Sequence, residues 1–189
     1  MTPPSPIERW PPVYDAEDLA ATIRRLVESD RLNDQFYSRF STPHGPFQGD
    51  IVRLRSGLPL IGADGALSIM GEYEHWMVIG NTCDIQRDLN DVTWSQVVPL
   101  EFLGSDSDLT SDQLRVLRKY SYSRRFYVPD WSPGRGRRHY VADFLRPVTV
   151  HKGALREAAQ VEARLGYYSW ILLHSCLVRF LARDDGRFT

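Results

Sequence analysis

The spacing of apolar residues changes from a helical to a strand-like period near residue 49. Before this point, apolar residues from Leu19 to Val27 recur at helical spacing, and Asp15 stands where a helix N-cap is expected. This pattern predicts an amphipathic helix over residues 15–29. Prolines crowd the first twelve residues and predict an extended tail over residues 1–14, because proline does not fit a helix interior.

After residue 49 the chain consists of short runs of β-favouring residues separated by turns. The runs are GDIVRLR, LPLI, HWMVIG, WSQVVPL, RRFYVP and RRHYVADF. HWMVIG and WSQVVPL lack alternation of apolar and polar residues, which is typical of strands covered on both faces of a tightly curled sheet. We therefore expect a barrel core over about residues 49–150.

Helical spacing returns twice within and after this core. Thr110 or Ser111 can cap a helix inserted over about residues 110–120. Near the C-terminus, the apolar spacing predicts two more helices, over residues 154–165 and 168–183. The predicted fold class is mainly β with added helices (α+β), in one domain that covers residues 15–189.

The composition excludes several classes of protein. A chain of 189 residues with 42% apolar residues can bury a core of its own. The net charge of -1 gives no whole-molecule argument for nucleic acid, a membrane or an acidic substrate. Two distant cysteines disfavour a disulfide framework and a zinc site, and no signal-peptide pattern opens the chain. We expect a cytoplasmic protein without a membrane segment, metal or cofactor.

Four fragments occur in the order that resembles the MazF/PemK family of small toxin barrels. They are GDIVRL at 49–54, MVIGN at 77–81, VVPL at 97–100 and YVADFLRPVTVHKGAL at 140–155. The resemblance covers about residues 49–155. It implies an SH3-like barrel, ribonuclease activity, a homodimer, and a role in a bacterial toxin–antitoxin or phage-defence system.

The positions that carry the family's chemistry are not matched. The family has an arginine just before the second fragment, where this chain has Trp76. It has threonine or serine after VVP, where this chain has Leu100. Charge that develops on a scissile phosphate must be met by a preorganised donor, which neither residue supplies. The resemblance therefore supports the fold more than the activity, because one fold can host many functions.

Four polar or reactive residues follow the apolar run MVI, at the end of a predicted strand. Asn81 and Thr82 are candidates for ligand contact, and the alternative is a turn closed by their own backbone. Cys83, beside Asp84, is a candidate nucleophile. His139 and Asp143 follow it in the chain order of papain-like hydrolases, and the alternative is a structural cysteine.

His75, at the start of the same strand, is a candidate general acid or base. Its ordinary pKa range suits proton transfer to or from a ribose hydroxyl or a leaving oxygen. The alternative is a histidine that only caps the strand. In a ribonuclease, an arginine such as Arg53 or Arg125 would hold the phosphate.

Arginines and aromatic residues alternate over residues 118–146. Arginine matches phosphate geometry and aromatic rings stack on unpaired bases, so this stretch is a candidate surface for single-stranded nucleic acid. In the alternative, the arginines keep a hairpin soluble while the aromatics pack inward. The candidate nucleic-acid contacts are Arg53, Arg124, Arg125, Arg135, Arg137 and Arg138, and the aromatics are Tyr120, Tyr122, Phe126, Tyr127, Trp131 and Tyr140.

Three hypotheses follow from the sequence. In the first, a MazF/PemK-like barrel binds RNA or another phosphate-bearing partner, through the hairpin around residues 124–138 and the strand end at 81–84, with or without cleavage. The second is a non-catalytic module that docks a partner protein. The third is a cysteine hydrolase that uses Cys83.

Overall fold

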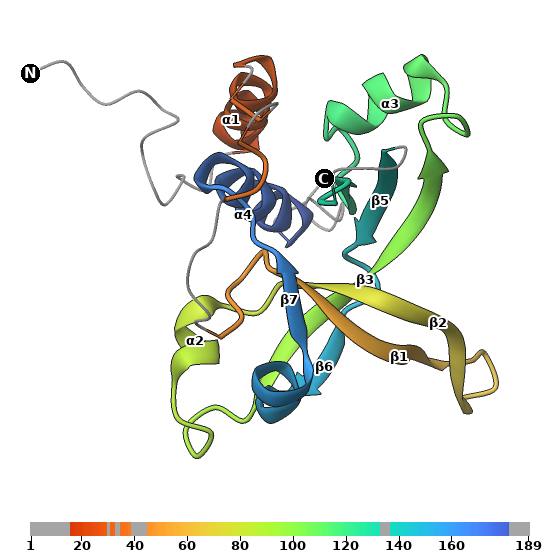
Figure 1. The fold of residues 1–189 in the computed structure, drawn as a ribbon, viewed down its shortest axis with the longest axis vertical. Helices are drawn as coiled ribbons and strands as arrows, with labels where there is room; N and C mark the ends of the chain where they lie inside the picture. Colours follow the sequence, from red (N-terminus) through yellow and green to blue (C-terminus); the bar gives the residue numbers. More distant parts are fainter. Residues whose placement is uncertain (1–15, 30, 33–34, 39–44, 133–136, 182–189) are drawn as a thin grey trace, which may run out of the picture.

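A computed structural model describes residues 16–29, 31–32, 35–38, 45–132 and 137–181 (Figure 1). The predicted tail over residues 1–14 and the last two residues of the predicted C-terminal helix lie outside the described residues. The predicted fold class is confirmed, because antiparallel strands dominate and helices are added around them.

The described strands form one seven-stranded sheet in the order β4-β5-β3-β2-β1-β7, with β6 also paired to β3. Every pairing is antiparallel. The two outer strands of this order, β4 and β7, do not pair, so the expected barrel is not closed. The strands are β1(Ile51–Ile61), β2(Leu67–Val78), β3(Trp94–Ser105), β4(Arg125–Pro129), β5(Arg138–Asp143), β6(Val148–His151) and β7(Gln160–Ala163).

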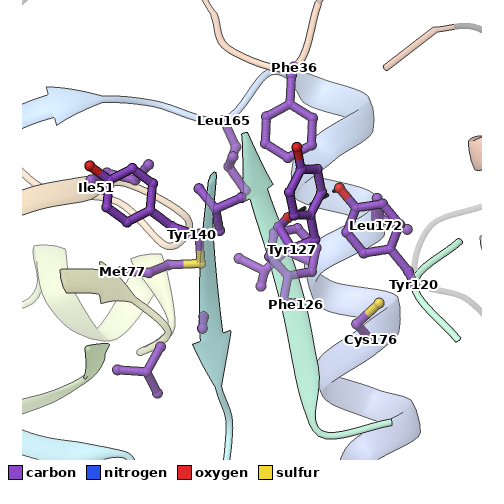
Figure 2. Packing of buried hydrophobic residues seen from close by; sticks show 14 of the residues in the cluster. Phe36, Ile51, Met77, Tyr120, Phe126, Tyr127, Tyr140, Leu165, Leu172 and Cys176 are labelled. Carbon is purple, nitrogen blue, oxygen red and sulfur yellow. Dashed lines mark hydrogen bonds between the residues drawn. The ribbon is translucent and has the colours of Figure 1, made fainter. Parts of the chain in front are cut away.

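Strand β3 connects two parts of the sheet. Its first half pairs with β2 and β6, and its second half pairs with β5. One apolar core lies between the sheet and the helices α1(Ala16–Glu28) and α4(Tyr167–Leu181), and Figure 2 shows Tyr120 and Phe126 in it beside Leu172 and Cys176 of α4. A second, smaller core includes Val52, Trp76 and Leu155.

Two short helices interrupt the strands. Between β3 and β4 lies α3(Ser111–Arg118), where Thr110 accepts from the Gln113 amide and Gln113 accepts from the Thr110 amide, a complete capping box. This is the inserted helix expected over about residues 110–120. Between β2 and β3 lies α2(Thr82–Gln86), which was not predicted.

The prediction of a helix over residues 154–165 is wrong. Only the turn η1(Ala154–Ala158) is helical, and the chain then forms β7. Val161 and Ala163 pair with Val52 and Ile51 of β1, where Ala163 is buried and Val161 is half-buried. Pairing with a distant strand outweighs the local helical spacing, which short apolar segments do not specify strongly.

Candidate active site

Arg53, His75 and Glu162 form a charged cluster across three adjacent strands. Arg53 and His75 are direct partners on β1 and β2, so their side chains share one face of the sheet. The His75 Nε2 atom lies 3.0 Å from Glu162 Oε2, and Arg53 Nη2 lies 2.6 Å from Glu162 Oε1. One carboxylate therefore joins a histidine and an arginine.

A β-bulge aims Glu162 at this pair. Ile51 and Val52 are consecutive on β1, but their partners Ala163 and Val161 leave Glu162 as an extra residue on β7. Bulges redirect a side chain, and they are enriched next to active sites. Directly after β7, Arg164 donates from Nε and Nη2 to the two oxygens of the fully buried Asp50, at 2.9 Å each. This ion pair fixes the end of β7 beside the start of β1.

Aromatic rings enclose the cluster on one side. Trp131, which follows β4, donates from Nε1 to Glu162 Oε2 at 3.2 Å. Its ring centroid lies 5.1 Å from that of His75 and 4.8 Å from that of Tyr140. The side chains of His75 and Glu162 are only 13% and 11% exposed, whereas Arg53 is 48% exposed. The cluster is shielded at its centre and opens to solvent at the arginine.

The surroundings favour the neutral form of His75. Burial lowers its pKa, and the nearby guanidinium groups of Arg53 and Arg138 act in the same direction, while the carboxylates of Glu162 and Glu74 oppose the shift. A neutral imidazole that donates from Nε2 to Glu162 carries its lone pair on Nδ1. The arrangement therefore provides an oriented base beside a cation.

The other predicted basic residues lie on β4, on β5 and next to them. Arg124, Arg137 and Arg138 are exposed, and Arg138 Nε lies 4.0 Å from Asp130. Arg125 is half-buried and pairs with Asp143 of β5, and the arginine that pairs directly with His75 is Arg53. Arg135 lies outside the described residues.

Most of the interleaved aromatics do not face a ligand. Tyr120, Phe126, Tyr127 and Tyr140 are buried in the first core (Figure 2). Burial raises the pKa of the Tyr120, Tyr127 and Tyr140 hydroxyls. For these four rings the inward-packing alternative describes the structure, and consecutive residues of β4 and β5 are buried, so this hairpin is covered on both faces.

The segment with Asn81 and Thr82 is the start of α2, and both side chains accept hydrogen bonds from backbone amides. Asn81 Oδ1 accepts from the Cys83 amide at 2.9 Å, and Thr82 Oγ1 accepts from the Gln48 amide at 3.0 Å. The Asp84 carboxylate lies 3.9 Å from Arg87 Nη1, a long ion-pair contact. The contact of Asn81 is that of a helix cap, which agrees with the alternative to ligand contact, whereas Thr82 joins α2 to the loop before β1.

Buried cations secure the other end of α2. Lys152 is fully buried and donates from Nζ to the carbonyl oxygens of Asp84 and Arg87, at 2.7 and 2.9 Å. Arg156 donates to the carbonyls of Ile85 and Arg87. Cations at a helix C-terminus satisfy carbonyls that have no partner within the helix. Figure 1 shows α2 well away from β5, so α2 and the basic hairpin do not form the continuous surface that was expected.

The structure does not assemble Cys83, His139 and Asp143 into a hydrolase triad. Cys83 is exposed on α2, whereas His139 is buried on β5. Both ring nitrogens of His139 are engaged, Nδ1 with the Tyr127 hydroxyl and Nε2 with Asp106, at 2.8 Å each. Asp143 Oδ1 accepts from the Leu145 amide. His139 therefore has no nitrogen available to activate a thiol.

Glu162 and Trp131 are the site residues that the sequence interpretation did not identify as partners of His75. Glu162 fell within a predicted helix, where a lone glutamate indicates a solvated face. Trp131 was considered as a base-stacking or an inward-packing residue, and not as a hydrogen-bond donor to Glu162. Within the described parts of the chain, no three His, Cys, Asp or Glu residues are grouped so that they could hold a metal ion, and no helix is long and apolar enough to cross a membrane.

Comparisons with protein-family models, with curated proteins and with solved structures gave no match. The MazF/PemK resemblance therefore stays a prediction from the four sequence fragments.

Proposed function

We propose that this protein binds single-stranded RNA at the Arg53–His75–Glu162 cluster and cleaves it by internal phosphoester transfer. The observation that carries the proposal is the single carboxylate that orients His75 and lies against Arg53. A base with a fixed tautomer next to a guanidinium group matches the needs of this reaction. A cytoplasmic role in a bacterial toxin–antitoxin or defence system belongs to the same proposal.

In this mechanism His75 acts as the general base. Its Nδ1 lone pair accepts the proton of a ribose 2′-hydroxyl while Glu162 stabilises the imidazolium that forms. The 2′-oxygen bonds to the adjacent phosphorus and the bond from phosphorus to the 5′-oxygen breaks. The proton then passes to the leaving 5′-oxygen, which gives a 2′,3′-cyclic phosphate and a 5′-hydroxyl.

Two arginines, Arg53 and Arg138, would hold the phosphate. Arg53 contacts Glu162 through Nη2 at 2.6 Å and Glu74 through Nε at a longer 3.6 Å, and a guanidinium group has further donors in a fixed geometry. Arg138 is 49% exposed, and its contact with Asp130 is long at 4.0 Å. Arg53 pairs directly with His75 across β1 and β2, and the guanidinium groups of both Arg53 and Arg138 act to lower the pKa of His75.

Binding is tested with a single-stranded RNA oligonucleotide at several salt concentrations. We expect an affinity that falls as salt rises, and a slope of log affinity against log salt that is smaller by about 1 in the R53Q variant. Arg115→Gln is the matched control, because Arg115 is an exposed arginine on α3 whose nearest described acid is Asp112. No affinity at low salt, or an affinity indifferent to salt, would contradict the proposal.

A second candidate function is protein docking, which the end of the β1–β2 hairpin favours. Pro59 pairs with Ile69, and Ile61 pairs with Leu67, so the four side chains share a face. Ile61, Leu67 and Ile69 are 76%, 71% and 66% exposed. Figure 1 shows this hairpin projecting from the body of the molecule. Apolar patches of this kind mark interaction sites.

The docking candidate is tested by replacing Ile61 and Ile69 with serine. Under this candidate, we expect the double variant to lose a stoichiometric protein partner, or the homodimer that the resemblance implies, while Leu145→Ser retains it. Leu145 is a suitable control because it is 50% exposed and lies outside the hairpin. A double variant with unchanged assembly in solution and unchanged capture of the partner would argue against docking at this face.

A further inference from the structure

Phe102 is an exposed aromatic residue in the middle of a paired strand. It lies on β3 directly opposite Tyr140 of β5, and its side chain is 54% exposed. Its ring centroid lies 5.6 Å from that of Tyr140. From Tyr140 the row continues to Trp131 and then to His75, with centroid distances of 4.8 and 5.1 Å. The buried Tyr140 therefore connects a solvent-facing ring to the proposed catalytic base.

We propose that Phe102 forms a stacking subsite for an unpaired nucleobase of the RNA whose phosphate lies between Arg53 and Arg138. This inference rests on the proposed function of the His75 cluster. An exposed aromatic face accepts any base, and stacking is tolerant of sequence because every base has a π-face.

Charge next to the aromatic row favours a nucleic-acid chain as the occupant. Arg138 lies two residues before Tyr140 on β5, so both side chains emerge on the same face of the strand. The Arg138 guanidinium also acts to lower the pKa of both Tyr140 and His75, so its positive charge is felt along the aromatic row. A single strand of RNA presents a flat base and an anion in every nucleotide, which matches a ring beside a guanidinium group.

The subsite predicts selection for unpaired RNA. Bases within a duplex are stacked on their neighbours and cannot lie on Phe102 without being extruded, which costs unpairing and unstacking free energy. Unpaired bases can be splayed onto an aromatic side chain. We expect the protein to bind a single strand more tightly than a duplex of the same sequence.

The test measures the affinity of the full chain for a single-stranded 2′-O-methyl oligonucleotide, which has no nucleophilic hydroxyl. Loss of one stacked base corresponds to an affinity lower by about 5- to 150-fold in Phe102→Ala. Phe102→Trp should restore the affinity. Trp94→Ala is the matched control, because Trp94 lies at the other end of β3 and is 57% exposed. The Trp94→Ala variant should bind the oligonucleotide with the affinity of the parent.

The outcomes separate the two proposals. If the parent binds no single-stranded RNA, both the proposed function and the subsite are wrong. If the parent binds and Phe102→Ala binds equally well, the subsite alone is wrong and the function of the His75 cluster stands. If Phe102→Ala keeps its RNA affinity but loses a stoichiometric protein partner, Phe102 belongs to a protein interface and the subsite is overturned.

Discussion

His75 and His139 each contact a carboxylate, but in very different surroundings. His75 Nε2 lies 3.0 Å from Glu162, and His139 Nε2 lies 2.8 Å from Asp106. The second nitrogen of His139 is held by the Tyr127 hydroxyl, and the His139 side chain is 1% exposed. The His75 cluster includes a half-exposed arginine instead.

The difference shows that a histidine next to a carboxylate is not sufficient for chemistry. A general base needs a nitrogen that can reach substrate, and a group that stabilises the charge developing nearby. His139 has both nitrogens saturated and joins β5 to Tyr127 of β4, which is a structural role. His75 is oriented by one contact and has Arg53 beside it. We therefore expect substitutions of His75 to affect activity and those of His139 to affect stability.

The largest expected effect is the loss of RNA cleavage in His75→Gln. Removing a general base costs about 10²- to 10⁴-fold in rate. Glutamine keeps an amide donor for Glu162, and Glu162 also retains Arg53 and Trp131, so the melting temperature should stay near that of the parent. Cleavage of an end-labelled single strand and a thermal melt measure the two quantities. Parent-like cleavage by a folded His75→Gln protein would remove His75 from the mechanism.

The next largest effect is the destabilisation of the fold in Tyr127→Phe. This variant leaves His139 Nδ1 without its hydroxyl partner in the core. An unsatisfied buried group costs about 1–3 kcal/mol. Because 1 kcal/mol shifts the melting temperature of a chain of this size by roughly 2–4 °C, the loss should be visible in a thermal melt. Below the melting transition, cleavage should remain within about twofold of the parent. A Tyr127→Phe variant with the melting temperature of the parent but a far lower cleavage rate would contradict this account. It would indicate that His139 serves activity and not stability.

The smallest expected effect is a shift in the pH dependence of the cleavage rate. The pKa of His75 is lowered from its ordinary value of 6.5, and only the neutral base accepts a proton. The cleavage rate should therefore rise with pH to a plateau, with the midpoint below 6.5. Since Glu162 raises the pKa of His75, Glu162→Gln should move that midpoint to still lower pH. A midpoint that does not respond to Glu162→Gln would show that another group controls the rate.

The same lowered pKa affects stability in a defined direction. As pH falls through 6.5, the unfolded chain binds a proton at His75 before the folded protein does. The contribution of His75 to the free energy of unfolding is therefore complete above 6.5 and decreases below it. The His75→Gln variant should lose this part of the pH dependence in a series of thermal melts.

Local sequence patterns correctly predicted those helices and strands whose formation depends mainly on their own residues. The Thr110 cap and the apolar spacing of α3 required no knowledge of the rest of the chain. In contrast, residues 160–163 carry a helical spacing and form a strand only because β1 is there to pair with them. Glu162 was missed for this reason, since a helix assignment gives no cause for it to face His75.

The candidate site was predictable in part. The sequence indicated His75 as a base and Arg53 as a clamp, and the register between β1 and β2 places them opposite one another. It also indicated Asn81, Cys83 and Asp84, because polar residues follow an apolar strand. The sequence pattern did not distinguish a ligand site from a helix cap, and the decisive contact at Asn81 is to the neighbouring backbone.

One measurement compares the two histidines directly. In protein with ¹⁵N-labelled histidine, the ring signals of His75 and His139 are followed by NMR while a single-stranded 2′-O-methyl oligonucleotide is added. If the His75 cluster is the working site, the His75 signals shift and saturate with the oligonucleotide, and those of His139 stay in place. Saturating oligonucleotide that leaves His75 unchanged, or that shifts His139 instead, would contradict the assignment of the active site.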